Sequence, residues 1–170
     1  MKDLKEIVEP LIQWFRENKR DLPWRQTKDP YAVWVSEIML QQTRVEAVKP
    51  YYIRFLQTLP TVKDLANADE EVILKLWEGL GYYSRVRNMQ KAAMQIMEDF
   101  GGVFPANQKD LLSLKGIGSY TAGAVGSIAF GLPIPAVDGN VLRVISRVTA
   151  SREDILKAST KKWMETHLKE

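Results

Sequence analysis

The stretch Leu114-Lys-Gly-Ile-Gly-Ser-Tyr-Thr-Ala122 is the part of this 170-residue chain that says most about its fold. Gly116 and Gly118 allow the backbone to turn sharply and to approach a partner without intervening side chains. A helix is expected to begin at Ser119, where the free N–H groups of the first turn favour a bound phosphate. The stretch therefore predicts a glycine turn between two helices, with a backbone grip on a phosphate group.

The residues on either side of this turn have further uses. Carbonyl oxygens that the turn leaves free, such as those of Leu112, Leu114 and Ile117, can hold a monovalent cation between protein and phosphate. The small residues of segment 121–127 allow the second helix to pack very close to a neighbour, which by itself explains their glycines.

An acidic residue, Asp138, opens the next expected helix within Val137-Asp-Gly-Asn-Val141. Aspartate is common at this position because its side chain caps the free N–H groups of the first turn. The same carboxylate, oriented by the cap, can also face a developing cation. A phosphate grip followed by a lone carboxylate suggests chemistry on a nucleic acid.

Glu37 is the second candidate acid, within Tyr31-Ala-Val-Trp-Val-Ser-Glu-Ile-Met-Leu40. Apolar residues occupy almost every side of that helix, so we expect Glu37 to be buried, where an unpaired charge is costly. Burial raises the pKa of a carboxyl group, as a general acid near neutral pH requires. The alternatives are a buried glutamate paired with an arginine and an exposed residue at the helix edge. One protonated and one charged carboxyl form the usual pair for cleaving a glycosidic bond.

Two other turns supply candidate contacts to nucleic acid. Leu40-Gln-Gln-Thr43 joins two expected helices, and its amides and hydroxyl can contact base edges or the sugar-phosphate backbone. Leu80, Tyr82 and Tyr83 lie beside glycines near Arg85, and such side chains can wedge between base steps. An ordinary polar turn and ordinary core packing are the alternative interpretations.

Hydrophobic periodicity predicts helices almost throughout the chain. Apolar residues recur at three-and-four spacing, and no strand-like alternation persists beyond a few residues. The expected helices cover residues 4–17, 30–40, 45–56, 84–100, 119–130, 139–148 and 160–168. Shorter helices are expected after the candidate caps Thr61, Asp69 and Asn107. The pattern predicts one compact all-α unit.

Composition narrows the functional classes. With 45% hydrophobic residues, 26% charged residues and a net charge of +3, the chain is ordinary for a globular protein. It has no cysteine, which excludes disulfides and thiolate ligands, and its one histidine, His167, cannot build a histidine-rich zinc site. No apolar run is long enough to span a membrane, and no signal-peptide core follows Met1, so we expect a cytoplasmic protein. Basic clusters at 16–25 and 85–91 fit either a solvated face or nucleic-acid contact.

Together, the hairpin and Asp138 motifs resemble the helix-hairpin-helix DNA glycosylase superfamily, with its endonuclease III-like fold. Three further segments narrow the resemblance to the adenine DNA glycosylases (MutY-like): Asp21-Leu-Pro-Trp-Arg25, Trp34-Val-Ser-Glu-Ile-Met-Leu-Gln-Gln-Thr-Arg44 and Trp77-Glu-Gly-Leu-Gly-Tyr-Tyr-Ser-Arg-Val-Arg-Asn88. The resemblance implies an all-α catalytic core of two helical lobes with an active cleft between them. Residues 24–131 would form a six-helix barrel lobe, and residues 1–23 with 132–170 would form the second lobe.

The family removes adenine mispaired with 8-oxoguanine or guanine in double-stranded DNA, after flipping it out of the duplex. By resemblance, Glu37 would protonate the adenine ring at N7, and Asp138 would stabilise the sugar cation by charge or by transient covalent attachment. Tyr120 and Asn140 would position sugar, water or carboxylate. Contacts to DNA or to the base would come from Arg20, Trp24, Arg25, Gln42, Thr43, Leu80, Tyr82, Arg85, Gly116, Gly118 and Ser119. We expect a monomer that binds DNA and no membrane.

Position 120 discriminates within the superfamily. Endonuclease III-like relatives carry a lysine there, which forms an imine with the sugar. Tyr120 therefore predicts a monofunctional glycosylase without an efficient strand-cleaving step. Two alternatives stay open: an endonuclease III-like glycosylase/lyase, against which Tyr120 argues, and a DNA-binding module that has lost catalysis.

The chain departs from the family pattern in two ways. Most members carry four cysteines that bind a 4Fe–4S cluster, and this chain has none, so we expect no cofactor in it. Most also carry a C-terminal domain related to Nudix hydrolases that helps to recognise 8-oxoguanine. The chain is therefore expected to be either a truncated member that lacks both parts, which we favour, or an unusual short member.

Overall fold

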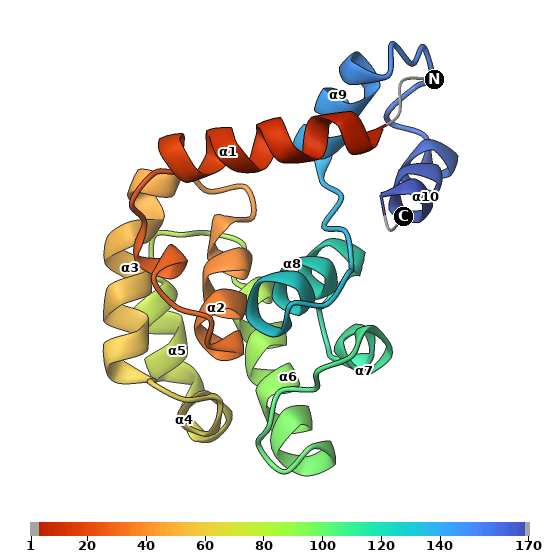
Figure 1. Ribbon diagram of the computed structural model, residues 1–170. Helices are drawn as coiled ribbons and strands as arrows, with labels where there is room; N and C mark the ends of the chain where they lie inside the picture. Colours follow the sequence, from red (N-terminus) through yellow and green to blue (C-terminus); the bar gives the residue numbers. More distant parts are fainter. Residues whose placement is uncertain (1–3, 169–170) are drawn as a thin grey trace.

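The computed structural model describes residues 4–168, and in this range every regular element is a helix (Figure 1). The all-α fold expected from the sequence is confirmed. None of the helices within residues 4–168 is long and apolar enough to cross a membrane. The elements in chain order are η1 (Leu4–Ile7), α1 (Val8–Asn18), η2 (Pro23–Arg25), α2 (Pro30–Leu40), α3 (Val45–Thr58), α4 (Val62–Asn67), α5 (Glu70–Trp77), α6 (Ser84–Asp99), α7 (Gln108–Ser113), α8 (Ser119–Phe130), α9 (Gly139–Val148) and α10 (Ala158–His167).

Helix α2 forms the centre of the fold. Eight of its eleven residues are buried, and it packs against both α3 and α8, between which it lies in Figure 1. Its start is fixed by Asp29, whose carboxylate accepts hydrogen bonds from the N–H groups of Tyr31 at 3.3 Å and Ala32 at 3.2 Å. Pro30 occupies the first helical position, where its missing N–H group costs nothing.

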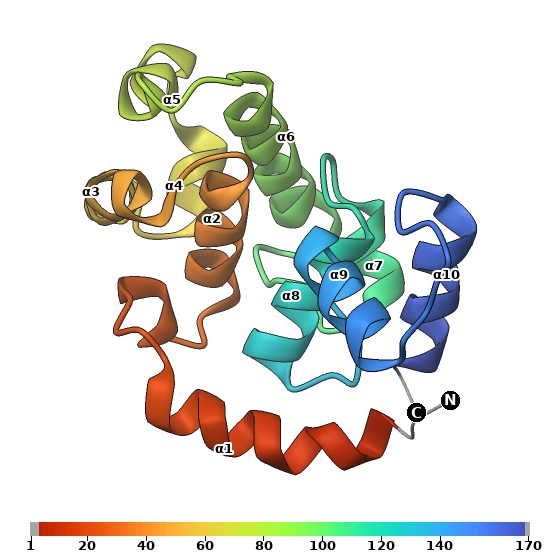
Figure 2. The ribbon, with the colours of Figure 1, turned by 90° about the horizontal axis from the view of Figure 1, so that it is seen from above.

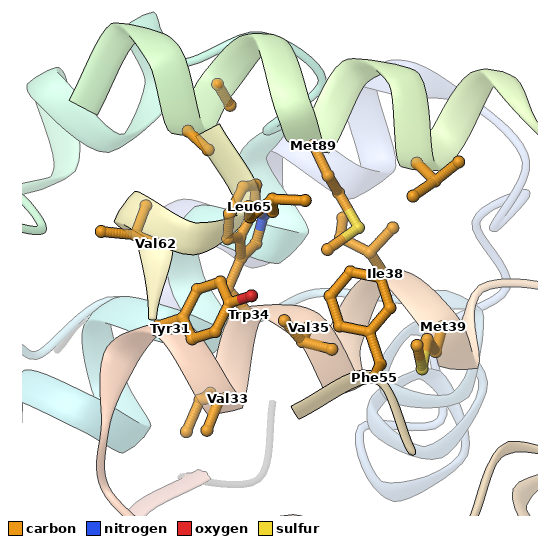
Figure 3. Close-up of a cluster of buried hydrophobic side chains, with 14 of the residues drawn as sticks. Tyr31, Val33, Trp34, Val35, Ile38, Met39, Phe55, Val62, Leu65 and Met89 are labelled. Carbon is orange, nitrogen blue, oxygen red and sulfur yellow. The ribbon is translucent and has the colours of Figure 1, made fainter. Parts of the chain in front are cut away.

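The main core lies between α2, α4 and α6 (Figure 3). Trp34 is fully buried and meets the ring of Phe104 edge-on, with the ring centroids 5.4 Å apart. The hydroxyl of Tyr31 donates a 2.8 Å hydrogen bond to the carbonyl of Leu59, and Met89 of α6 points toward α2 in Figure 3. Each fully buried large apolar side chain stabilises the folded state by about 1.5–3 kcal/mol relative to leaving it exposed to water. The position of α2 is therefore set by packing on most of its surface.

Two of the candidate caps form as the sequence predicts. Thr61 and Asp64 make a capping box at the start of α4: Thr61 Oγ1 accepts from the Asp64 N–H at 3.2 Å, and Asp64 accepts from the Thr61 N–H at 3.0 Å. Asn107 Oδ1 accepts the N–H of Asp110 at 2.9 Å at the start of α7. Asp69 precedes α5 as expected, but its side chain makes no capping hydrogen bond. Asp69 therefore occupies the predicted N-cap position, but the predicted capping hydrogen bond from its side chain is wrong.

Buried apolar side chains form two clusters. The larger one draws on η2 and on the helices from α2 to α8. The smaller one joins α9 and α10 through Val137, Leu142, Ile145 and Met164, and partly buried side chains of η1 pack against it. Figures 1 and 2 show α9 and α10 near the N-terminal end of the red helical segment that contains α1. The division into two lobes stays a prediction, and the two clusters support it.

Helix α1 runs along the outside of the molecule, from near η2 to near α9 (Figures 1 and 2). Its helical periodicity is predicted correctly, but none of its residues is buried. Leu11 is 56% exposed and Trp14 is 59% exposed. The apolar residues that produce the periodicity therefore lie at the surface of the part of the chain that the structure describes.

The segment before α9 crosses α8 at very short range, and two glycines make room for it. A Cβ atom on Gly123 would collide with the carbonyl of Pro135, and one on Gly126 would lie 3.0 Å from Cδ1 of Ile134. The sequence attributed these glycines to close packing with an unspecified neighbour. The structure identifies that neighbour as the segment that leads directly to Asp138.

Replacing Gly123 with alanine is expected to lower the free energy of unfolding by about 1–3 kcal/mol. The new methyl group must push the Pro135 segment away from α8. Denaturant titration followed by circular dichroism measures the change. Gly139→Ala is the matched control, because a Cβ there meets no neighbour within 4 Å. Equal stability of the two variants would show that the close contact does not constrain this segment.

Candidate active site

Glu37 lies at the edge of the core on α2. Its neighbours Ser36 and Ile38 are both buried, whereas Glu37 itself is partly exposed. The expectation of a buried glutamate is met in part. The flanking residues fix the backbone, while the carboxyl group stays accessible from one side.

Tyr120 brings helix α8 to Glu37. It is the second residue of α8, directly after the hairpin, and it is partly buried. Its hydroxyl group lies within hydrogen-bonding reach of the carboxyl group of Glu37, where it lowers the pKa of the glutamate. Because α2 and α8 already pack against each other, this contact forms between two helices that the core holds in place.

Asp138 completes the group of three. It is the N-cap of α9, where Oδ1 accepts the N–H of Val141 at 2.8 Å and Oδ2 accepts the side-chain amide of Asn140 at 3.1 Å. Its charge lies close enough to Glu37 and Tyr120 to act on the pKa of each. The structure therefore brings Glu37, Tyr120 and Asp138 together, and it gives Asn140 a role in orienting the aspartate.

Burial is the main influence on the Glu37 carboxyl group, and it raises the pKa of that group above its ordinary value. The hydrogen bond with Tyr120 acts in the opposite direction, and the negative charge of Asp138 raises the pKa further. Burial, together with the Glu37 charge, also raises the pKa of the Tyr120 phenol. Tyr120 therefore remains a neutral hydrogen-bond donor, while Glu37 holds a proton more readily than an exposed glutamate.

The hairpin before α8 has the backbone that the sequence predicts. Gly116 has φ +76°, and a Cβ there would lie 2.9 Å from Cβ of Asn88, so only glycine fits without strain. Gly118 is the N-cap of α8 and leaves the first N–H groups, including that of Ser119, without a side-chain cap. The N–H of Lys115 donates a 2.8 Å hydrogen bond to the side chain of Gln95, which ties the hairpin to α6.

The candidate ligands for a monovalent cation lie around the same hairpin. Leu112 is exposed, Leu114 and Ile117 are buried, and the carbonyl of Leu114 accepts the N–H of Ile117 at 3.1 Å. The cation site stays a prediction. Within residues 4–168 there is no group of three or more histidine, aspartate or glutamate side chains that could hold a metal ion. An iron–sulfur cluster does not fit this chain, because it needs thiolate ligands and the sequence has no cysteine.

The two turns expected to contact DNA differ in how they present their side chains. Gln42 and Tyr82 are exposed, and Thr43 is partly exposed. Leu80 is buried in the core, which is the alternative interpretation given for it above, and its role as a wedge stays a prediction. Arg85 is partly buried, and its guanidinium group donates hydrogen bonds to backbone carbonyls of both turns.

The segment around η2 gathers the remaining candidates. Trp24 is buried and meets Tyr52 edge-on, with ring centroids 5.4 Å apart. Arg25 donates a 3.1 Å hydrogen bond to the carbonyl of Arg20 and lies over the ring of Phe15. The placement of Arg20, Trp24 and Arg25 beside an extruded base stays a prediction.

Sequence reasoning missed the residues that support the hairpin from α6. Gln95 and Asn88 lie on the face of α6 that meets the hairpin, yet neither belongs to a local pattern. Their role follows only from the packing of α6 beside residues that are distant in the sequence. An alignment of related sequences is the signal that would have found them.

Proteins of known family resemble this chain over most of its length. The family model for the HhH-GPD superfamily of base excision DNA repair proteins matches residues 35–170. A rat adenine DNA glycosylase is 47% identical over 161 residues, which cover 89% of this chain and 31% of the relative. The human adenine DNA glycosylase is 48% identical over 153 residues, covering 85% of this chain and 28% of the relative. The chain thus spans less than a third of the length of these two relatives.

Solved structures agree on the fold. A thermostable thymine-DNA glycosylase superposes with a TM-score of 0.84 at 30% sequence identity, covering 96% of this chain and 77% of the other. A trapped covalent intermediate of endonuclease III with DNA superposes with a TM-score of 0.78 at 23% identity, covering 96% of this chain and 76% of the other, and this likeness concerns the fold alone. The sequence motifs, the hairpin geometry and these matches agree: the chain belongs to the HhH-GPD superfamily of base excision DNA repair proteins.

Proposed function

We propose that this chain is the catalytic core of a monofunctional DNA N-glycosylase that removes adenine mispaired with 8-oxoguanine or guanine. The observation that carries the proposal is the convergence of Glu37, Tyr120 and Asp138 beside the hairpin. Relatives named adenine DNA glycosylases match most of the chain, which supports adenine as the base. An N-glycosidic bond needs a better leaving group and a stabilised sugar cation, and the site offers one acid for each task.

Glu37 supplies the proton. Its raised pKa keeps more of the carboxyl groups protonated at a given pH than in an exposed glutamate, as a general acid requires. Transfer of that proton to a ring nitrogen of adenine lets the base leave as a neutral molecule. The Tyr120 hydroxyl orients the carboxyl group through their shared hydrogen bond.

Asp138 stabilises the sugar. A positive charge develops on the sugar ring as the bond to the base breaks, and a fixed carboxylate beside it lowers the barrier. Two hydrogen bonds, from the Val141 N–H and the Asn140 amide, hold the Asp138 carboxylate in one orientation. Pre-organisation of this kind means that the carboxylate does not have to reorient during the reaction.

Double-stranded DNA is the proposed partner, and the hairpin supplies its grip. The uncapped N–H groups at the start of α8 suit a phosphate oxygen. The adenine must leave the base stack to reach Glu37, because the glycosidic bond is inaccessible inside a duplex. Gln42 and Tyr82, on exposed turns, are the proposed contacts to the strand that stays behind.

The exchange of Glu37 for glutamine is expected to slow adenine release by roughly a hundredfold or more, since the proton donor is lost. Asp138→Asn is expected to slow it by a similar factor of roughly a hundred, because the charge is removed while a capping residue is retained. Both are measured under single turnover on a duplex with adenine opposite 8-oxoguanine. Binding of the same duplex, measured by fluorescence anisotropy, should stay within about threefold.

Asp29→Asn is the matched control for Asp138→Asn, because Asp29 caps α2 in the same way. It should leave the rate of base release close to that of the wild type. A Glu37→Gln variant with wild-type activity would remove Glu37 from the mechanism. Wild-type protein that binds the duplex and releases no base would support the DNA-binding module instead.

The pH dependence of base release should reveal the Tyr120–Glu37 bond. The rate is expected to fall at alkaline pH as Glu37 loses its proton. Tyr120 donates to the charged form of Glu37 and so lowers the pKa of the glutamate. In Tyr120→Phe this effect is lost, and the alkaline limb of the pH–rate profile should move to higher pH. A limb that stays in place, or moves to lower pH, contradicts the proposed role of the hydroxyl.

Borohydride should trap little covalent adduct between this protein and DNA. Trapping needs an imine between an amine and the sugar, and a phenol at position 120 cannot form one. Gel electrophoresis of the borohydride-treated reaction measures the adduct. Tyr120→Lys is the matched variant, since it places an amine at the same point of α8 and should raise adduct formation. Efficient trapping by the wild type would favour the glycosylase/lyase alternative.

A further inference from the structure

The guanidinium group of Arg85 lies between two turns that are far apart in the sequence. Its two terminal nitrogens donate hydrogen bonds of 2.5–3.2 Å to five backbone carbonyls, those of Ile38, Met39, Gln41, Leu80 and Gly81. The first three belong to the end of α2, just after Glu37, and the other two to the turn that precedes α6. A planar guanidinium can reach acceptors on both sides in this way, whereas a lysine ammonium group cannot.

The same two turns contain unusual backbone conformations. Within residues 4–168 the non-glycine residues with positive φ are Gln42 (58°), Tyr82 (48°) and Ala150 (53°). Two of these three thus follow a carbonyl that Arg85 holds: Gln42 comes after Gln41, and Tyr82 after Gly81. Non-glycine residues in this left-handed region of backbone conformation are strained, and the conformation persists only where the surrounding structure enforces it.

The side chains at the two strained positions, Gln42 and Tyr82, are both accessible to a binding partner. Tyr82 is 64% exposed, and Gln42 is also exposed. The Arg85 guanidinium lies 5.7 Å from the centre of the Tyr82 ring and 5.2 Å from that of Trp77. Trp77 in turn donates a 3.0 Å hydrogen bond from Nε1 to the carbonyl of Gly81. One cation therefore contacts both turns and the ring of one of the two exposed residues.

Arg85 has little capacity left for DNA. Its terminal N–H groups already serve the five carbonyls, and its Nε is buried. A phosphate could gain these donors only if the carbonyls lost them. The family resemblance implied that Arg85 contacts DNA, whereas in the structure its terminal donors meet carbonyls of the protein itself.

We propose that Arg85 is a positioning residue that locks the 41–43 and 79–83 turns into one rigid element. This element presents Gln42 and Tyr82 together to the base opposite the extruded nucleotide, and it ties them to the end of the helix that carries Glu37. The proposal rests on the function proposed above, because it takes the opposite base as the object that the two side chains contact.

Hydrogen exchange in the free protein tests whether Arg85 holds the two turns together, and it does not require enzymatic activity. In Arg85→Lys, the backbone amides of both turns should exchange about fivefold faster or more, because both lose their shared partner. Arg147→Lys, the same substitution at an exposed site on α9, should change neither turn. Faster exchange in only one turn, or in neither, would overturn the proposal.

Base release tests the coupling to the opposite strand. Arg85→Lys and Tyr82→Ala should each slow release of adenine opposite 8-oxoguanine by about tenfold. The double variant should be no slower than the slower single variant, because both changes disable one element. On a duplex with an abasic site opposite the adenine, each loss should shrink to about twofold. If the rate losses of the two single variants were additive, or equal on both duplexes, Arg85 would be needed for general stability and the proposal would be wrong.

The salt dependence of binding separates positioning from direct contact. It is measured in the Glu37→Gln background, so that the adenine stays attached. Log affinity falls with log salt concentration, and loss of one phosphate contact reduces the magnitude of this slope by about one. Arg85→Lys and Arg85→Met should both leave the slope unchanged, and a decrease of about one in Arg85→Met would show that Arg85 binds DNA. Failure of the wild type to release adenine would contradict the proposed function. The hydrogen-exchange experiment would still test whether Arg85 holds the two turns together.

Discussion

The hydroxyl of Tyr120, in the first turn of α8, lies within hydrogen-bonding reach of the carboxyl of Glu37 on α2, the helix at the centre of the fold. The start of α8 is also where the hairpin offers its free N–H groups. In the proposed function, the same short stretch of backbone would position both a phosphate at the hairpin and a base beside Glu37. The segment that crosses α8 at Gly123 then delivers Asp138 to the same place.

The electrostatics of this contact combine opposing effects. Desolvation and the charge of Asp138 raise the pKa of Glu37, and the hydrogen bond from Tyr120 moderates the rise. A glutamate without the phenol would hold its proton more firmly and give it up less readily. A glutamate in water would rarely carry a proton at neutral pH. The environment therefore raises the pKa of Glu37 above that of an exposed glutamate, while Tyr120 limits the rise.

The sequence predicted those features that arise from bonds between residues close along the chain. The caps at Thr61, Asn107 and Asp138 and the conformation of Gly116 all depend on interactions or steric limits within a few residues. Contacts across the fold left no such signal. The collision that makes Gly123 a glycine and the five carbonyls around Arg85 depend on segments that only packing brings together. Periodicity likewise predicted α1 as a helix but not its exposure, because it does not say which neighbour covers a face.

Arg85 shows that residue type alone does not say which groups a basic side chain contacts. A basic side chain beside a glycine turn is typical of a phosphate contact, yet here the donors serve the backbone of the protein. Fewer basic groups than the sequence contains are then available to phosphates, in a chain whose net charge is only +3. Long-range attraction of this size is weak at physiological salt. In the proposed function, recognition would therefore depend on geometry: a hairpin tied to α6 by Gln95 and two turns with positive φ held by one guanidinium group.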